Sequence, residues 1–242
     1  MKTFYELLEK ELQLSPFANT KRKIKIITDR SYRPLRYEFG LHMFKGWDKE
    51  VEEKDKRFLF SIELVNLSFY LIKLVLRREM DKDDKAIHLL IADGLLTLAY
   101  KEAGDYLSFV TDNVDSMLRG RGLMIDLAAH KRKFVLLEEI IELVNNSSFK
   151  TIARYIAKSL YPETDFISIA TGLGSMVGLY LYLQTELSDD KKKIFTGMPL
   201  CVNLKDILEL KFIEELSIDI LNAIEEYRII LKLKPETFKF FL

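Results

Sequence analysis

Residues 61–78 read SIELVNLSFYLIKLVLRR, a long apolar stretch with no proline or glycine and with one lysine, Lys73, in its middle. A stretch of this length and composition predicts an α-helix. A lysine inside such a helix is unusual. Either its aliphatic stem carries the ammonium group to solvent, or the lysine occupies a place where another residue type is expected.

The same helical character extends over most of the chain. Five prolines and ten glycines in 242 residues leave long uninterrupted segments, in which apolar residues recur at spacings of three and four. Clear examples are FYELLEKELQL (4–14), FVLLEEIIELV (134–144) and FIEELSIDILNAIEEYRIILKL (212–233). The sequence therefore predicts an all-α fold, with residues 1–242 forming a single-domain bundle of about eight to ten helices.

Composition narrows the range of partners and compartments. The chain has 37 basic and 37 acidic residues, so no net charge favours binding to nucleic acid. The lone Cys201 excludes a disulfide framework and a cysteine-rich metal site, and we expect a cytoplasmic protein. The three histidines, His42, His88 and His130, lie far apart and lack the spacing of metal ligands.

One segment is apolar enough to cross a membrane. Residues 166–185, FISIATGLGSMVGLYLYLQT, contain no charge, and Gly174 and Gly178 form a GxxxG pattern. A buried helix that packs closely through its small residues explains the segment equally well. Because no cluster of basic residues flanks the segment, we expect no membrane span.

Residues 86–100, AIHLLIADGLLTLAY, carry Asp93 within an apolar helix, where an acidic side chain must be paired or hydrogen-bonded. This segment resembles AGDALLxLAF, a helix of the trans-prenyl diphosphate synthases, and other segments resemble elements of that family in the same order. They are DRSYRPL (29–35; GGKRxRP), SIELVNLSFYLI (61–72; AIELIHxxSLIH), SSFKTIARYIAKSL (147–160; a Lys-Thr pair), GSMVGLYLYLQTELSDD (174–190; GxxxGxxFQxxDDxxD) and GMPLCVNL (197–204; GKxTxP). The resemblance implies the isoprenoid synthase fold.

The family joins an allylic diphosphate to isopentenyl diphosphate after the allylic C–O bond ionises. Two DDxxD motifs hold the Mg²⁺ ions that grip the diphosphate. When the first motif is aligned with this chain, Lys73, Leu74 and Arg77 stand in place of its three aspartates. The acids that follow, DKDD (81–84), are better explained as the start of the next helix, where the helix dipole favours them.

The second aspartate-rich motif is lost in part. Thr185, Glu186 and Asp189 stand in its place. Glu186 and Asp189 retain oxygen ligands that bind a cation weakly, but solvated acids at a helix end are the simpler interpretation. We therefore expect no metal site in this chain, and Mg²⁺ only through a catalytic partner.

The resemblance also implies residues that bind the diphosphates and line the lipid tunnel. The implied diphosphate contacts are Arg30, Arg33, Lys150 and Thr151. A simpler alternative makes Arg33 part of a helix start and Lys150 a surface lysine. Phe69 and Tyr70 stand where bulky residues of the family form the floor of the lipid tunnel, and we expect them to fill it.

Three hypotheses follow from the loss of the aspartates. The first is that the chain resembles the small regulatory subunits of heteromeric prenyl diphosphate synthases, which lack the aspartates and need a catalytic partner subunit. Pairing with a second copy of the chain remains open. The second is an enzyme of altered chemistry in the same fold. The third is a binding or structural protein that has kept only the fold.

Overall fold

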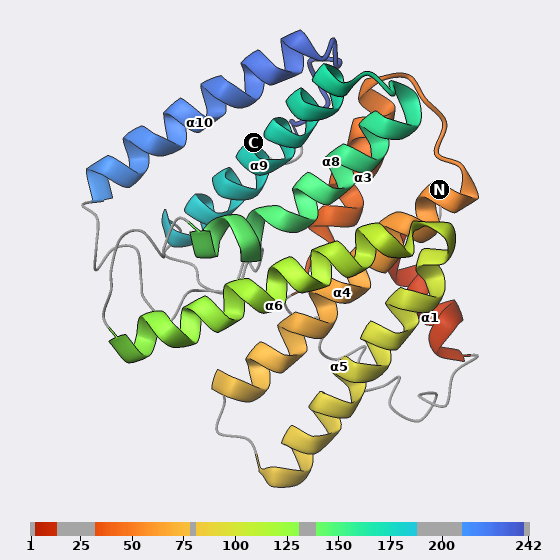
Figure 1. The fold of residues 1–242 in the computed structure, drawn as a ribbon, viewed down its shortest axis with the longest axis vertical. Coiled ribbons are helices and arrows are strands. Elements are labelled where there is room, and N and C mark those ends of the chain that lie inside the picture. Colours follow the sequence, from red (N-terminus) through yellow and green to blue (C-terminus); the bar gives the residue numbers. More distant parts are fainter. Residues whose placement is uncertain (1–2, 14–31, 78–80, 131–138, 188–209, 240–242) are drawn as a thin grey trace. The chain divides into compact units, whose positions relative to one another are not determined.

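The computed structural model describes residues 3–13, 32–77, 81–130, 139–187 and 210–239 (Figure 1). These residues form α-helices and contain no strand, so the all-α prediction is confirmed. A 3₁₀ turn, η2 (Gly104–Tyr106), and a π-helical turn, η3 (Glu142–Asn146), interrupt them. The α-helices are α1 (Phe4–Gln13), α3 (Leu35–Gly46), α4 (Glu53–Arg77), α5 (Lys82–Ala103), α6 (Leu107–His130), α8 (Ser147–Leu160), α9 (Thr164–Leu187) and α10 (Leu210–Ile230).

The chain divides into two compact units. The first unit comprises Met1–Tyr37 and Glu52–Thr111, and the second comprises Glu38–Val51 and Asp112–Leu242. Helix α4 therefore belongs to the first unit, whereas α8, α9 and α10 belong to the second. The single domain remains a prediction.

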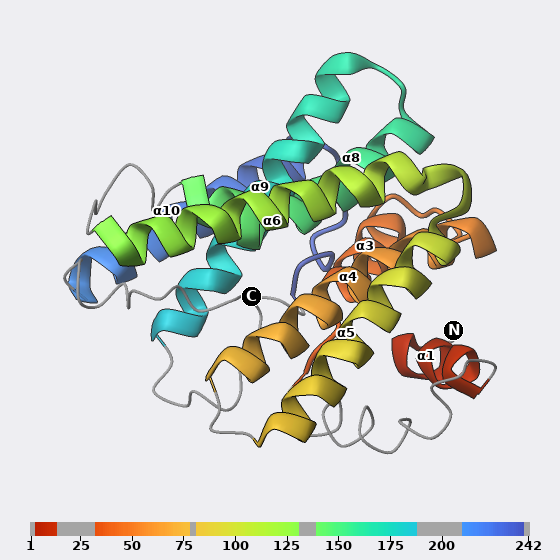
Figure 2. The same cartoon turned by 60° about the horizontal axis from the view of Figure 1, so that its bottom comes forward.

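The first unit is built on the paired helices α4 and α5, which run side by side (Figures 1 and 2). Ser68 of α4 donates a hydrogen bond to the carbonyl of Ala92 of α5 (2.8 Å). Helix α5 begins where the acids of DKDD predicted a helix start, because the Asp81 carboxylate accepts the backbone N–H of Asp84 (2.7 Å). That prediction is confirmed.

Asp93 corrects an expectation about α5. The sequence predicted a paired or hydrogen-bonded acid inside an apolar helix, but Asp93 is exposed. The reason is its place on the helix, since Leu90 precedes it by three residues and Thr97 follows it by four, and both are also exposed. Asp93 thus lies on the outer face of α5 and needs no buried partner.

The second unit depends on the close approach of α8 and α9. A Cβ on Gly174 would lie 2.6 Å from the carbonyl oxygen of Phe149, and one on Gly178 would lie 2.9 Å from the Cα of Asn146. Only a residue without a side chain allows these contacts. The prediction of a helix packed closely through its small residues is confirmed. In the same unit, Trp47 donates its indole N–H to the carbonyl of Leu231 (2.8 Å).

Within the described residues, two helical segments have the length and the apolar composition needed to cross a membrane. They are Glu53–Val75 and Thr164–Gln184, which meet the criteria of length and composition alone. Nearly all of the first segment is buried inside the protein, as is half of the second. Burial of this kind is typical of helices in a protein core. The expectation of no membrane span remains a prediction.

Candidate functional site

The face of α4 that would carry the first aspartate-rich motif has only uncharged and basic residues after Glu63. Positions 63, 66, 70, 73 and 77 share one face of the helix, because they follow one another at spacings of three and four. No acid lies between Glu63 and Arg77. Lys73 is only 5% exposed and Leu74 is also buried, so the burial of Lys73 argues against a side chain that extends into solvent.

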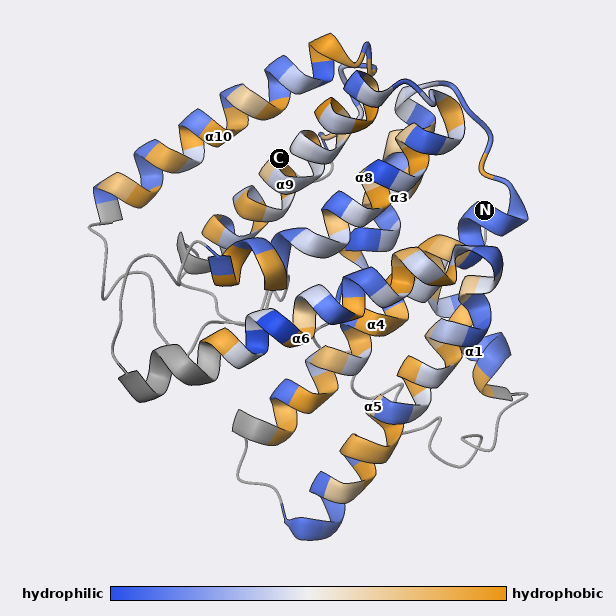
Figure 3. Cartoon of the chain, viewed as in Figure 1, coloured by the Kyte–Doolittle hydropathy of each residue, from blue (hydrophilic) through white to orange (hydrophobic). Residues whose placement is uncertain are grey.

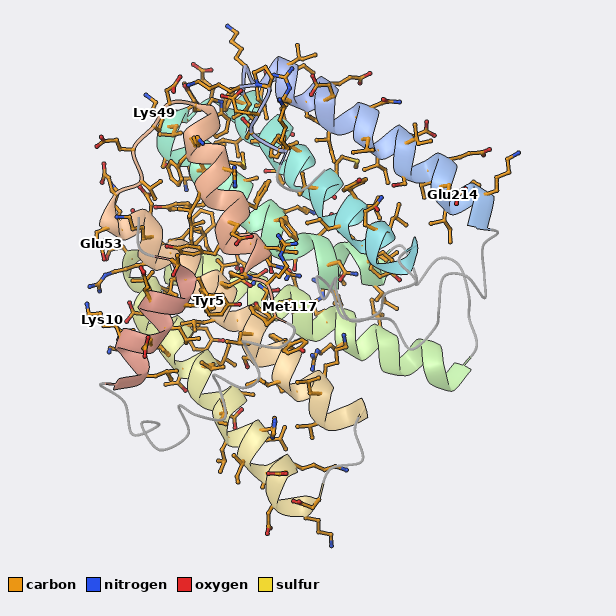
Figure 4. The ribbon with its side chains drawn as sticks, turned by 180° about the vertical axis from the view of Figure 1, so that it is seen from behind. Tyr5, Lys10, Lys49, Glu53, Met117 and Glu214 are labelled. Atoms are coloured by element: carbon orange, nitrogen blue, oxygen red, sulfur yellow. The ribbon has the colours of Figure 1, made fainter. Side chains whose placement is uncertain are left out.

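The segment around Arg33 packs on this same face of α4. The ring of Tyr32 lies 5.4 Å from the ring of Tyr70, measured between centroids. Tyr5, which projects from α1 (Figure 4), donates a hydrogen bond to the carbonyl of Tyr32 (2.5 Å). Arg33 is exposed. The first unit therefore brings the arginine-proline element beside the helix of the first motif.

Glu63 anchors this segment from inside α4. Its carboxylate accepts the hydroxyl of Tyr32 and the backbone N–H of Tyr37 (2.8 Å), and it also accepts the backbone N–H of Arg36. Arg36 and Tyr37 are in the first turn of α3, where backbone N–H groups lack partners within the helix. Pro34 precedes α3 and has no side-chain oxygen for this purpose, so Glu63 caps the helix from a distance.

Glu63 lies at a site that disfavours its charged form. Burial raises the pKa of the Glu63 carboxyl, and the positive charge of Arg36 and the three hydrogen bonds only partly offset that rise. Burial and the neighbouring carboxylate raise the pKa of Tyr32 well above its usual value. Glu63 and Arg36 were both missed from the sequence. Glu63 is an acid within an apolar helix, which is the same signal that was applied to Asp93.

The predicted tunnel-floor residues, Phe69 and Tyr70, are both buried. Tyr70 packs against Tyr32 within the first unit. A side chain that fills an apolar tunnel must be buried, so this placement is compatible with the prediction, which remains untested.

In the second unit, Lys150 belongs to a polar cluster centred on Glu142. Its ammonium group donates to the Oε1 atom of Glu142. The Oε2 atom accepts the amide of Asn146 (2.8 Å) and the hydroxyl of Ser175 (2.9 Å). Thr151 is half-buried. Lys150 is therefore paired with a carboxylate and about one third exposed, and both its role as a diphosphate contact and the surface-lysine alternative remain predictions.

Burial alone would raise the pKa of the Glu142 carboxyl. Hydrogen bonds from Lys150, Asn146 and Ser175, together with the charge of Lys150, outweigh burial and lower that pKa. The carboxylate form is thus the stable form of Glu142, and it is held by three donors from α8, α9 and η3.

Several predicted site residues cannot be placed. Arg30 and Asp189 lie outside the described residues. Arg77, Thr185 and Glu186 lie in the last turns of α4 and α9, and only their backbone is described. Within the described part of the chain, no three His, Cys, Asp or Glu side chains lie together as metal ligands would. The expectations about both aspartate-rich motifs remain predictions for these residues.

No protein-family model matches the sequence, and no curated protein sequence matches it. The fold, however, is similar to solved structures. An FPP/GFPP synthase from Zymomonas mobilis has a TM-score of 0.63 at 13% identity, over 86% of this chain and 82% of its own. A geranylgeranyl pyrophosphate synthase from Bacteroides thetaiotaomicron also scores 0.63 at 15% identity, over 98% and 83% of the two chains.

A decaprenyl diphosphate synthase from Rhodobacter capsulatus gives a TM-score of 0.66 at 12% identity, over 98% of this chain and 91% of its own. Identities this low show that the fold is shared. The isoprenoid synthase-like fold implied by the resemblance is therefore confirmed.

Proposed function

We propose that this chain is a non-catalytic subunit of a heteromeric prenyl diphosphate synthase and contributes to isoprenoid chain elongation through a catalytic partner. The observation that carries the proposal is the face of α4 occupied by Lys73. This face has no carboxylate beyond Glu63, and Glu63 is already used to cap α3. An all-α fold similar to that of prenyl diphosphate synthases supports the proposal, but it also fits a catalytic synthase.

Charge balance explains why this face would not support ionisation of an allylic diphosphate. Each Mg²⁺ ion held by a DDxxD motif brings two positive charges to the leaving diphosphate. A lysine brings one, and it holds no metal. A loss of several kcal/mol of transition-state stabilisation follows, and each ~1.4 kcal/mol is a tenfold change in rate.

The partner we propose is a synthase subunit with intact aspartate-rich motifs, which would supply the Mg²⁺ ions. Two adjacent leucines of α5, Leu89 and Leu90, are exposed, and they support this choice as contacts for a partner. Figure 3 shows the hydrophobic stretch in the first half of α5 in orange. A second copy of this chain is the alternative occupant. We place the complex in the cytoplasm.

Two measurements test the proposal. The purified chain is first incubated with Mg²⁺, isopentenyl diphosphate and short allylic diphosphates, and we expect a turnover below about 0.01 per second. It is then mixed with synthase chains from the same genome that carry both DDxxD motifs. We expect co-elution at micromolar concentration and a change in product length. Turnover by the chain alone, or failure to bind any such synthase, would reject the proposal.

A matched pair of variants tests the α5 surface. We expect L89E/L90E to abolish co-elution with the synthase without lowering the melting temperature, because both leucines are exposed. Ile218→Glu is the control, since Ile218 is a comparably exposed apolar residue on α10. Equal loss of binding in both variants would show that α5 has no specific role.

The second candidate is a protein of the same fold that binds diphosphate, with altered chemistry or none. The cluster around Lys150 favours it, because a cation and two neutral donors converge there on one carboxylate. Binding of diphosphate by a chain that binds no synthase would favour this candidate over the first.

A further inference from the structure

Helix α10 of the second unit has a buried inner side and an exposed outer side. Its buried side chains recur every three or four residues, and they are Ile213, Ser217, Ile220 and Ile224. On this inner side α10 packs along α9, where the Gln184 amide donates to the Ser217 hydroxyl (3.0 Å). Figure 3 shows that apolar and hydrophilic residues alternate along the helix. The outer side is therefore a mixture of apolar and charged residues, and we next consider how they are arranged.

A row of acids runs along the outer side of α10. Five acids are exposed there, and they are Glu214, Glu215, Asp219, Glu225 and Glu226. Glu215, Asp219 and Glu226 share one stripe, because spacings of four and seven residues are close to one and two turns. Lys211 is the one exposed base among residues 211–230, so five carboxylates face solvent with a single ammonium group. The charges of the whole chain, by contrast, cancel.

Ion pairs compensate only two of the five acids. Lys211 lies 3.8 Å from Glu215, between Nζ and Oε1, and the Arg228 guanidinium donates two hydrogen bonds to Glu225 (both 2.6 Å). Among the described residues, no base is paired with the other three acids. Like charges four residues apart on a helix repel each other, as Glu215 and Asp219 do. A partner that brings positive charge to this row would relieve that repulsion.

Large apolar side chains border the acidic row on both sides. Ile218 and Ile229 are 11 residues apart, close to three turns, and they follow one side of the row. Phe212 and Ile230 are 18 residues apart, or five turns, and they follow the other side. Each of the four is more than half exposed, and together they make up four of the nine large apolar side chains exposed in the described residues. Apolar side chains gathered in this way mark surfaces that bind a partner.

The sign of the charge distinguishes between classes of partner. A row of carboxylates repels nucleic acids and the anionic surface of a membrane. A polypeptide with a row of lysines or arginines between apolar residues, however, matches both the acids and their apolar borders. The five turns from Phe212 to Ile230 are about 27 Å long, which is the length of a helix of about 18 residues.

We propose that the acidic row and its apolar borders form a docking surface for a basic amphipathic helix of a partner protein. Lysines or arginines of that helix would lie over Glu215, Asp219 and Glu226, and its apolar residues would cover the isoleucines on either side. This partner is distinct from the synthase, whose proposed contacts are on α5. The inference therefore does not rest on the proposed function.

The experiment measures binding of a fluorescent helical peptide of about 18 residues to the full chain by fluorescence anisotropy. The peptide carries a row of lysines flanked on both sides by leucines. We expect binding at micromolar concentration in low salt, and an affinity lower by about tenfold or more in high salt. A peptide with glutamates in place of the lysines should not bind, nor should vesicles of phosphatidylserine.

Two double variants separate the contribution of charge from that of apolar contact. We expect D219K/E226K to lower the affinity for the basic peptide by about tenfold or more and to weaken its salt dependence. We expect I218S/I229S to lower the affinity by a similar factor and to leave the salt dependence unchanged. All four residues are exposed, so both variants should keep the circular dichroism spectrum and melting temperature of the wild type.

Matched variants on other helices provide the controls. D93K/D115K makes the same change of charge at exposed acids of α5 and α6, and L107S/L118S removes two exposed leucines of α6. Both should bind the peptide as the wild type does. Unchanged affinity in the two α10 variants, or an equal loss in the controls, would overturn the proposal. Binding of the vesicles in place of the peptide would also overturn it, because the partner would then be a membrane.

Co-elution with the synthase distinguishes this surface from the one in the proposed function. I218S/I229S should keep co-elution while it loses the peptide. Loss of both in that variant would overturn the proposal of a separate partner and assign α10 to the synthase interface. A chain that binds no synthase would fail the proposed function, but the peptide measurements would still decide whether α10 is a docking surface.

Discussion

Glu63 in the first unit and Glu142 in the second are both carboxylates with several donors, but they differ in depth. Glu63 is fully buried, and burial raises its pKa despite Arg36 and three hydrogen bonds. Glu142 is partly exposed, and its hydrogen bonds outweigh burial and lower its pKa. The donors around Glu63 are closed to solvent and serve the fold, whereas Glu142 and its partner Lys150 are partly open to solvent.

Replacement of Glu63 by alanine should have the largest effect. The variant removes the acceptor of the Tyr32 hydroxyl and of the first turn of α3, and it removes the negative charge that interacts with the buried Arg36. We expect the free energy of unfolding to fall by about 3–5 kcal/mol, the usual cost of breaking a buried charged group from its partners. Urea denaturation followed by circular dichroism measures this loss.

Glu142→Ala is the matched control for Glu63→Ala. The side chain is partly exposed, so we expect a loss of no more than about 1 kcal/mol. Equal losses in the two variants would remove the distinction between a buried carboxylate and a partly exposed one.

The glycines of α9 test the close packing of α8 against α9, the two helices that supply Lys150 and Ser175 to the Glu142 cluster. Gly174→Ala would place a Cβ 2.6 Å from the Phe149 carbonyl oxygen, and we expect a loss of about 1–3 kcal/mol from overpacking. Gly122→Ala is the control, because nothing lies within 4 Å of a Cβ on this residue of α6. The control should gain about 0.5–1 kcal/mol from helix propensity. A neutral result for Gly174→Ala would contradict the close approach of α8 and α9.

Asp81 provides a local cap to compare with the remote cap made by Glu63. We expect Asp81→Ala to lower the free energy of unfolding by about 0.5–2 kcal/mol, because the N–H of Asp84 loses its acceptor in an exposed place. Asp83→Ala is the control, since Asp83 is in the same helical turn and exposed. A loss for Asp81→Ala as large as that for Glu63→Ala would show that burial does not distinguish the two caps.

The two caps also explain how much of the fold was predictable from sequence. Asp81 and the helix it caps are neighbours in the chain, so a short sequence window contains the whole signal. Glu63 and the turn it caps are separated by 26 residues, and the segment before α3 contains no hint of its acceptor. The same limit explains Asp93, because periodicity shows that a helix has faces but not which face a neighbour covers.

The candidate sites divide in the same way. The resemblance singled out Arg33 and Lys150 as diphosphate contacts, but it did not show which segments pack against them. Glu142, Asn146 and Lys150 are spaced by four residues, so their sequence could have suggested a shared helical face. Ser175 comes from another helix, and no local pattern identifies it. Nor does any local pattern show that Glu142 is the group held by Lys150.

The smallest expected effect is in the pH dependence of stability, and it has opposite signs at the two carboxylates. The pKa of Glu142 is lowered from its ordinary value of 4.5 on folding. Its contribution is therefore present above about pH 4.5 and is lost as the pH falls through the folded pKa. The pKa of Glu63 is raised, so its contribution is complete below its unfolded pKa and is lost as the pH rises through the folded pKa.

Urea denaturation of the wild type, Glu63→Gln and Glu142→Gln between about pH 7 and pH 3.5 separates the two cases. The deficit of Glu142→Gln relative to the wild type should shrink toward acid, by no more than about 1 kcal/mol because the pair is partly exposed. The deficit of Glu63→Gln should grow over the same range. Parallel curves for the two variants would mean that folding shifts the pKa values of both carboxylates in the same direction. That result would contradict the difference between Glu63 and Glu142.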